Sequence, residues 1–116
     1  MSRLGPEHCL AVYGTLAPGR SNHGQLAGLA GTWSPGVVRG ELFQEGWGAV
    51  QGYPGLRLDP AGGEVAVQVF ASPDLPAHWD RLDRFEGAEY RRVVATVMGE
   101  DGPVEANIYA IARPKT

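Results

Sequence analysis

The chain has 116 residues, of which 43% are hydrophobic and 20% charged, and its net charge at neutral pH is −3. These values are typical of one folded globular domain and exclude a disordered chain. A nucleic-acid-binding protein needs a clustered basic face, whereas Arg91 and Arg92 are the only adjacent basic residues. We therefore expect a single domain over residues 1–116 that has no nucleic-acid partner.

The sequence also argues against a membrane protein and a metal site. No apolar run approaches the roughly 20 residues that span a bilayer, and the N-terminus has no apolar segment of signal-peptide length. Cys9 is the only cysteine, so no internal disulfide can form, in agreement with a cytoplasmic protein. The histidines are scattered rather than paired at the spacing of metal ligands. We expect a cytoplasmic protein with no membrane partner and no bound metal.

Short strands joined by tight turns are predicted for the N-terminal part of the chain. Glycine accounts for 17 of the 116 residues, about twice the roughly 7% average usage, and such an excess indicates turns. Residues 8–13 are predicted to form a strand buried on both faces, in which Cys9 is a small core residue rather than a nucleophile. The elements expected next are a short helix around Leu26 and Leu29, a bent strand at 36–45, an irregular segment at 47–58 and a strand at 64–71.

The main helix is predicted to begin at Ser72 and to end before Gly87. Ser72 is a good N-cap and Pro73 suits the first helical position, while glycine is common just past a helix end. Three apolar residues at helical spacing predict the buried face of this helix: Leu75, Trp79 and Leu82.

Two strands at 90–98 and 103–112 follow the helix. They are separated by Gly99-Glu100-Asp101-Gly102, a segment that predicts a hairpin. The predicted fold is therefore a strand-dominated α+β domain, with a curled or barrel-like sheet and one main helix.

The turn Tyr13-Gly14-Thr15-Leu16 is the first candidate functional segment, because it follows directly on a buried strand. Gly14 lets the backbone approach a ligand closely, Thr15 adds a hydroxyl, and backbone N–H groups that point the same way can hold a small anion. The alternative is a structural turn with Tyr13 packed in the core, and these four residues alone favour that alternative.

Glu86 is the candidate catalytic residue. It follows Leu75, Trp79 and Leu82 by offsets that place it within about 40° of all three on a helical wheel, whereas Asp83 is expected to be a solvated charge. Partial burial and the negative end of the helix dipole both raise the pKa of a carboxyl group, which suits a general acid/base. The alternative is a frayed last turn whose glutamate reaches water, and spacing alone favours it.

Several motifs together resemble the γ-glutamylcyclotransferase-like family over nearly the whole chain. They are Val12-Tyr13-Gly14-Thr15-Leu16 with Gly19 and Asn22-His23, Tyr53-Pro54-Gly55-Leu56, Leu82-Asp83-x-Phe85-Glu86-Gly87 with Tyr90-x-Arg92, and Ile108-Tyr109. The resemblance implies a small mixed β-barrel flanked by one main helix and one or two short helices.

The resemblance also implies an activity and a set of site residues. Active relatives convert a γ-glutamyl amine or peptide to 5-oxoproline and a free amine without metal or cofactor. Glu86 would then be the catalytic acid/base, and the substrate-binding residues would be Tyr13, Gly14, Thr15, Leu16, Tyr90 and Tyr109. The substrate's own α-amino group would be the nucleophile, so the protein would act by orienting it and by moving protons.

Two other functions remain open at this point. The same fold could serve as a non-catalytic module that binds a small molecule or a protein, in which case the Glu86 pKa would be ordinary. A purely structural interaction domain would need a broad exposed apolar patch, which the sequence does not clearly supply.

Overall fold

The computed structural model describes residues 5–13, 26, 28–43, 46–47, 50–51, 55–86 and 90–111. The elements, in chain order, are η1 (Pro6–His8), β1 (Cys9–Val12), β2 (Thr32–Phe43), β3 (Gly46–Trp47), β4 (Val50–Gln51), β5 (Gly55–Leu58), β6 (Gly63–Ala71), η2 (Leu75–His78), α2 (Trp79–Glu86), β7 (Tyr90–Gly99) and β8 (Gly102–Ile111). The β7–β8 hairpin is confirmed, with pairing from Tyr90 with Ile111 to Gly99 with Gly102.

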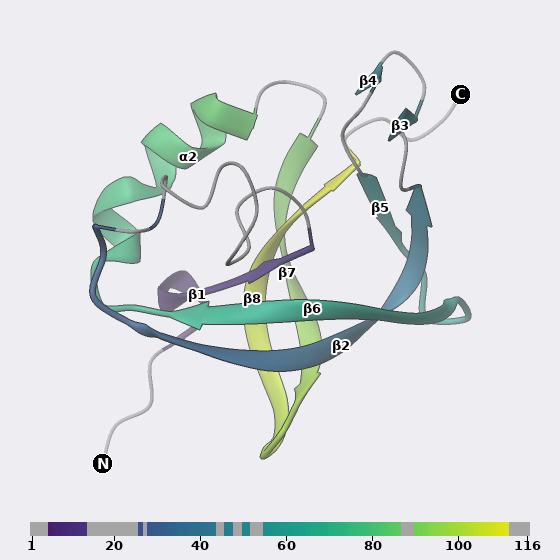
Figure 1. Cartoon of the computed structure of the whole chain (residues 1–116), viewed down its shortest axis with the longest axis horizontal. Helices are drawn as coiled ribbons and strands as arrows, with labels where there is room; N and C mark the ends of the chain where they lie inside the picture. The colour runs from purple at the N-terminus through teal and green to yellow at the C-terminus, as the bar shows by residue number, and fades with distance from the viewer. Residues whose placement is uncertain are drawn as a thin grey trace.

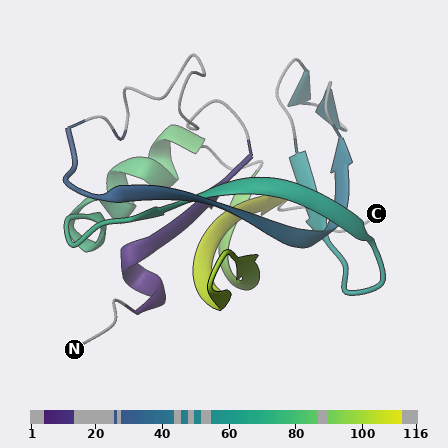
Figure 2. The same ribbon diagram turned by 60° about the horizontal axis from the view of Figure 1, so that its bottom comes forward.

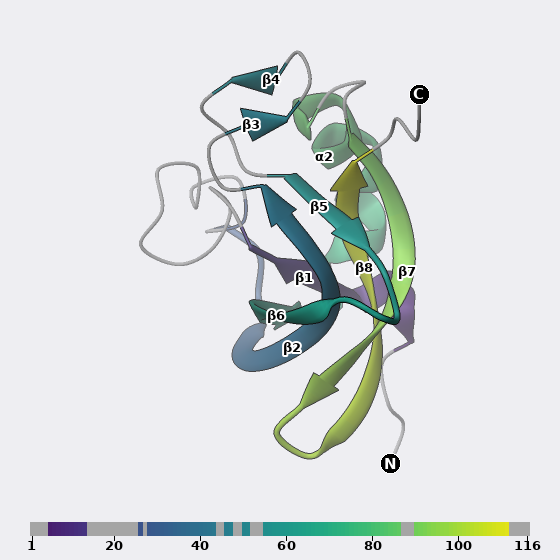
Figure 3. The same cartoon turned by 90° about the vertical axis from the view of Figure 1, so that its right-hand side faces the viewer.

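Five strands form a closed mixed barrel, so the predicted fold class is confirmed. They are hydrogen-bonded in the order β2-β6-β1-β8-β7, and β7 returns to pair with β2. The β1–β8 pair is parallel, and the other pairs are antiparallel. Figure 3 shows these strands around one interior, with β5 added beside β2. The β3–β4 ribbon lies beyond the end of β2 (Figure 1).

The long strand β2 closes the barrel because it pairs with three different strands. Its first part runs antiparallel to β6, as the two long curved ribbons in Figure 2 show. At Gly36 and Val37 it also meets the far end of β7. A Cβ atom at Gly36 would lie 2.5 Å from Cγ1 of Val97, so this close approach of β7 requires glycine.

Two groups of buried apolar residues stabilise the molecule. Residues from β1, β2, β5, β6, β7 and β8 fill the barrel, and a second group lies between the barrel and α2. Strand β1 contributes to both, with Cys9 and Ala11 in the barrel group and Leu10 and Val12 in the helix group. This confirms the prediction of a strand buried on both faces. A fully buried valine or leucine side chain, such as Val12 or Leu10, contributes roughly 1.5–3 kcal/mol.

The start of the main helix differs from the prediction. Residues Leu75–His78 form a 3-10 helix, and α2 begins only at Trp79. An α-helix capped by Ser72 would need the N–H of residue 76 for its first hydrogen bond, and Pro76 has none. Instead, Leu75 donates its N–H to the Ser72 carbonyl, and the Ser72 hydroxyl accepts the Asp74 N–H at 3.0 Å. The predicted buried face is confirmed for Leu75, Trp79 and Leu82.

Candidate active site

The structure places four of the predicted site residues in or next to defined elements. Tyr13 follows β1 directly, Tyr90 begins β7, Tyr109 lies in β8, and Glu86 is the last residue of α2. Gly14, Thr15 and Leu16 lie outside the described residues, as does the side chain of Glu86. Their assigned roles therefore stay predictions, as do the substrate-binding roles of the three tyrosines.

Tyr13 fixes the point at which the chain leaves β1. Its hydroxyl donates a hydrogen bond to the backbone carbonyl of Tyr109 in β8 and accepts one from the N–H of Leu56 in β5, at 3.2 Å. The ring is half-buried and packs against the barrel core. The first residue of the predicted binding turn is thus held between β5 and β8.

Tyr109 connects the barrel to α2. Its side chain is 5% exposed and belongs to the apolar group between the barrel and the helix. Its hydroxyl donates a hydrogen bond to Oδ1 of Asp83, at 2.6 Å. One residue therefore contacts Tyr13 through its carbonyl oxygen and α2 through its hydroxyl. The two segments that the sequence singles out are joined through β8.

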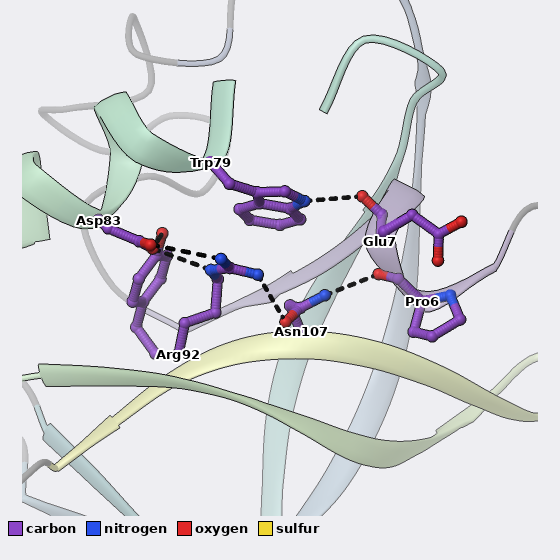
Figure 4. Close-up of polar contacts among 7 residues, drawn as sticks. Pro6, Glu7, Trp79, Asp83, Arg92 and Asn107 are labelled. Carbon is purple, nitrogen blue, oxygen red and sulfur yellow. Dashed lines mark hydrogen bonds and ion pairs between the residues drawn. The ribbon is translucent and has the colours of Figure 1, made fainter. Parts of the chain in front are cut away.

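Arg92 in β7 holds the same carboxylate from the other side. Its Nε lies 2.9 Å from Oδ1 of Asp83 and its Nη2 lies 3.3 Å from Oδ2, the forked arrangement that gives strong charge-assisted bonds. The guanidinium lies beneath the indole of Trp79 (Figure 4). Its central carbon is 4.3 Å from the ring centroid, a distance at which the cation is attracted to the ring. Arg92 therefore joins β7 to α2 at two residues of the helix.

The network continues to the N-terminal 3-10 helix. Nη1 of Arg92 donates to Oδ1 of Asn107 at 3.1 Å, and Nδ2 of Asn107 donates to the Pro6 carbonyl at 2.8 Å. The Trp79 indole N–H donates to the Glu7 carbonyl at 2.9 Å (Figure 4). Asn107 is buried, and a buried amide must be paired in this way. The 3-10 helix η1, the helix α2 and the β7–β8 hairpin are thereby held as one unit.

Asp83, expected to be a solvated charge, has a side chain that is 41% exposed, but its carboxylate is also paired with Arg92 and Tyr109. Burial would raise the pKa of Asp83, but hydrogen bonds from Arg92 and Tyr109 and the charge of Arg92 together lower it below the ordinary value. Local spacing gives no sign that Arg92 faces Asp83, because Arg92 lies on β7 and Asp83 on α2. The resemblance is the signal that groups Asp83 with Arg92, since both fall within its motif Leu82-Asp83-x-Phe85-Glu86-Gly87 with Tyr90-x-Arg92.

Glu86 follows Leu82 by four residues and Trp79 by seven, and both of these residues are buried. The part of the wheel argument that uses Leu75 does not apply, because Leu75 lies in the 3-10 helix and α2 begins at Trp79. The burial and pKa of the Glu86 carboxylate stay predictions.

Among the described residues, the other candidate groups form no site. Burial and the nearby Glu7 raise the pKa of Cys9, which agrees with a core thiol rather than a nucleophile. In the part of the chain that the structure describes, no three histidine, cysteine, aspartate or glutamate side chains are grouped to hold a metal ion. Within the same residues, no helix has the length and apolar composition to cross a membrane.

Comparisons with known proteins place this geometry in a family context. The family described as "Gamma-glutamyl cyclotransferase, AIG2-like" matches residues 10–116. A comparison with curated protein sequences gives no match.

Solved structures share the fold. YkqA from Bacillus subtilis has a TM-score of 0.71 and 27% identity, over 90% of this chain but only 36% of YkqA. A mouse AIG2-like protein has a TM-score of 0.70 and 22% identity, over 92% of this chain and 80% of its own. At5g39720.1 from Arabidopsis thaliana has a TM-score of 0.70 and 23% identity, over 94% of this chain and 71% of its own.

Proposed function

Because the chain belongs to the AIG2-like γ-glutamyl cyclotransferase family, we propose that it converts a small γ-glutamyl amine or peptide to 5-oxoproline and a free amine. The family supports a cyclotransferase-type function, and the substrate and the catalytic glutamate are our proposal. One observation carries it: Tyr109 contacts both Tyr13, which leads into the predicted binding turn, and Asp83, on the helix that ends at Glu86.

The proposed reaction needs no nucleophile from the protein. The α-amino nitrogen of the glutamyl group attacks its own γ-carbonyl carbon, a new C–N bond closes the five-membered ring, and the original amide C–N bond breaks. Holding the flexible chain so that amine and carbonyl nearly touch removes much of the entropic barrier. Glu86 takes the proton released by the attacking amine and delivers one to the leaving amine.

The binding turn would supply the polar contacts in this scheme. Backbone N–H groups of Gly14, Thr15 and Leu16 would either anchor the substrate carboxylate or stabilise the oxyanion that forms on the γ-carbonyl. Tyr90, from β7, and the ring of Tyr109, from β8, would border the same space, while the Tyr109 hydroxyl binds Asp83. A small γ-glutamyl compound is the proposed partner, and a cytoplasmic location stays a prediction from the sequence.

A panel of γ-glutamyl amines and dipeptides, with 5-oxoproline as the measured product, tests the proposal. We expect turnover of at least one compound and a loss of roughly 100-fold or more in kcat for Glu86→Gln. The matched control is Glu64→Gln, which removes an exposed carboxylate on β6 and should leave kcat unchanged.

Two results would count against this function. No 5-oxoproline from any compound would contradict it, as would full turnover by Glu86→Gln. Tight binding of γ-glutamyl compounds without product would favour the non-catalytic binding module instead.

A further inference from the structure

We propose that Tyr109 is a positioning residue for this reaction, one that ties the binding turn to the helix that carries the catalytic carboxylate. The inference rests on the proposed function. It assigns Tyr109 a role that it exercises through Tyr13 and Asp83, rather than through its hydroxyl on the substrate.

We call the two hydrogen bonds Tyr13–Tyr109 and Tyr109–Asp83 the tie. The first of them lies where β1 stops pairing with β8. The parallel ladder runs from Leu10 with Asn107 to Ala11 with Ile108 and ends there. Just beyond it, the Tyr13 hydroxyl donates to the Tyr109 carbonyl. A side chain thus continues a connection that the backbone no longer makes, at the residue immediately before Gly14. The place at which the turn begins therefore depends on the position of Tyr109.

The second half of the tie lies on α2. The Tyr109 hydroxyl donates to Asp83, which precedes Glu86 by three residues, less than one helical turn. Helix α2 has only eight residues, and a helix this short depends on tertiary contacts more than on its own hydrogen bonds. The contact at Asp83 is made in the half of the helix that ends at Glu86, so it restrains that end.

The acceptor of the Tyr109 hydrogen bond is itself held in place. Arg92 binds both carboxylate oxygens of Asp83 and is fixed in turn by Trp79 and Asn107. A hydrogen bond to a carboxylate with such partners restricts the orientation of α2 more than a bond to a mobile surface side chain would, because several contacts must break together. The path from Tyr13 to α2 is therefore continuous and supported at each end.

Such a tie affects turnover more than binding. Cyclisation requires the amine, the γ-carbonyl and the carboxylate to be aligned together, and a displacement of about 1 Å can cost 10²-fold in rate. The glutamyl group would still be held by the turn if α2 shifted. Loosening the tie should therefore lower kcat and leave KM nearly unchanged.

Tyr109→Phe tests this, because it keeps the buried ring and removes only the hydroxyl. Hydrogen exchange of the backbone amides of residues 83–86 reports on the end of α2, and steady-state kinetics report on the reaction. We expect exchange to accelerate by roughly tenfold, as for a lost hydrogen bond to a charged group. We expect kcat to fall by roughly tenfold, with KM within about twofold.

Two further variants separate positioning from general destabilisation. Thr96→Val is the matched control, since it removes a hydroxyl that donates to the Glu105 carboxylate on the same hairpin, at an exposed site. It should change neither exchange at 83–86 nor kcat. Asp83→Ala removes the carboxylate acceptor, so adding Tyr109→Phe to it should lower kcat by less than Tyr109→Phe does alone.

The outcomes distinguish this inference from the proposed function. Unchanged exchange at 83–86 in Tyr109→Phe would overturn the tie, whatever the activity. Faster exchange with unchanged kcat would overturn its part in the reaction. A wild-type protein that forms no 5-oxoproline would overturn the proposed function and the catalytic part of the inference, while exchange would still decide whether the tie exists.

Discussion

Arg92 and Asp83 form a two-bonded ion pair between strand β7 and helix α2, with Nε to Oδ1 at 2.9 Å and Nη2 to Oδ2 at 3.3 Å. The side chains are 27% and 41% exposed, respectively, so water screens the pair only in part. The Arg92–Asp83 pair is also supported by the Trp79 ring. It therefore differs from a fully solvated surface ion pair, which contributes little to stability.

Arg92→Met should lower the free energy of unfolding by about 1–2 kcal/mol, because it leaves a half-buried carboxylate without its cation and removes the contact with the indole. Urea denaturation at neutral pH measures this. The matched control is Arg57→Met, which breaks the exposed Arg57–Glu41 pair at 2.7 Å and should cost less than about 0.5 kcal/mol. Equal losses of unfolding free energy in the two variants would show that the Arg92–Asp83 pair stabilises the protein no more than an exposed pair does.

The stability that Asp83 contributes should depend on pH. Its pKa is lower in the folded protein than the ordinary value, so the unfolded chain binds more protons and stability rises with pH through this range. The contribution is fully present above about pH 5 and is lost as pH falls below about 4. Asp83→Asn removes this titration, so the stability difference between wild type and variant should shrink on acidification.

Urea denaturation of both proteins between about pH 3 and pH 7 measures that difference. In the Arg92→Met background the trend should weaken, because the main partner that lowers the Asp83 pKa is gone. A difference that stays constant with pH would contradict the assignment of a lowered pKa to this carboxyl group.

The long strands and a barrel-like sheet are predictable from the sequence, whereas the short strands β4 and β5 lie in a segment predicted to be irregular. The strand pairings that close the barrel are not predictable from local patterns. The hairpin and the buried strand at 8–13 follow from alternation and turn residues, which are local. The parallel pairing of β1 with β8 and the meeting of Gly36 with Gly99 join segments that no local pattern connects. The predicted helix start is wrong because Pro76 has no N–H to donate to the Ser72 carbonyl in the first α-helical hydrogen bond.

The candidate site likewise has parts that are predictable from the sequence and parts that are not. The turn at Tyr13 and the helix around Glu86 are visible as motifs, but Asp83 could not be distinguished from a solvated charge without knowing that Arg92 and Tyr109 face it. Hydrogen bonds between side chains of different elements have no period in the sequence. The pairing, and with it the connection between turn and helix, therefore emerges only from the three-dimensional arrangement.

Tyr13→Phe should destabilise the protein by about 1–3 kcal/mol, even though the ring is retained. The lost hydroxyl leaves the N–H of Leu56, a fully buried residue, without that acceptor, and the Tyr109 carbonyl without that donor. Chemical denaturation measures the change, with Thr96→Val as the control for loss of an exposed hydroxyl. A loss no greater than that of the control would show that the Tyr13 hydroxyl does not hold the end of β1.

Gly36→Ala should weaken the closure of the barrel. The new Cβ would lie 2.5 Å from Cγ1 of Val97 and 3.3 Å from the Met98 carbonyl oxygen, and relieving such contacts in a packed core costs about 1–3 kcal/mol. Gly63→Ala is the matched control, since a Cβ there meets nothing within 4 Å. If the contact with Val97 is the cause, Val97→Ala should make Gly36→Ala less costly in the double variant, as thermal unfolding would show. If the loss in the double variant equals the sum of the losses in the two single variants, the strain lies in the β7 backbone instead.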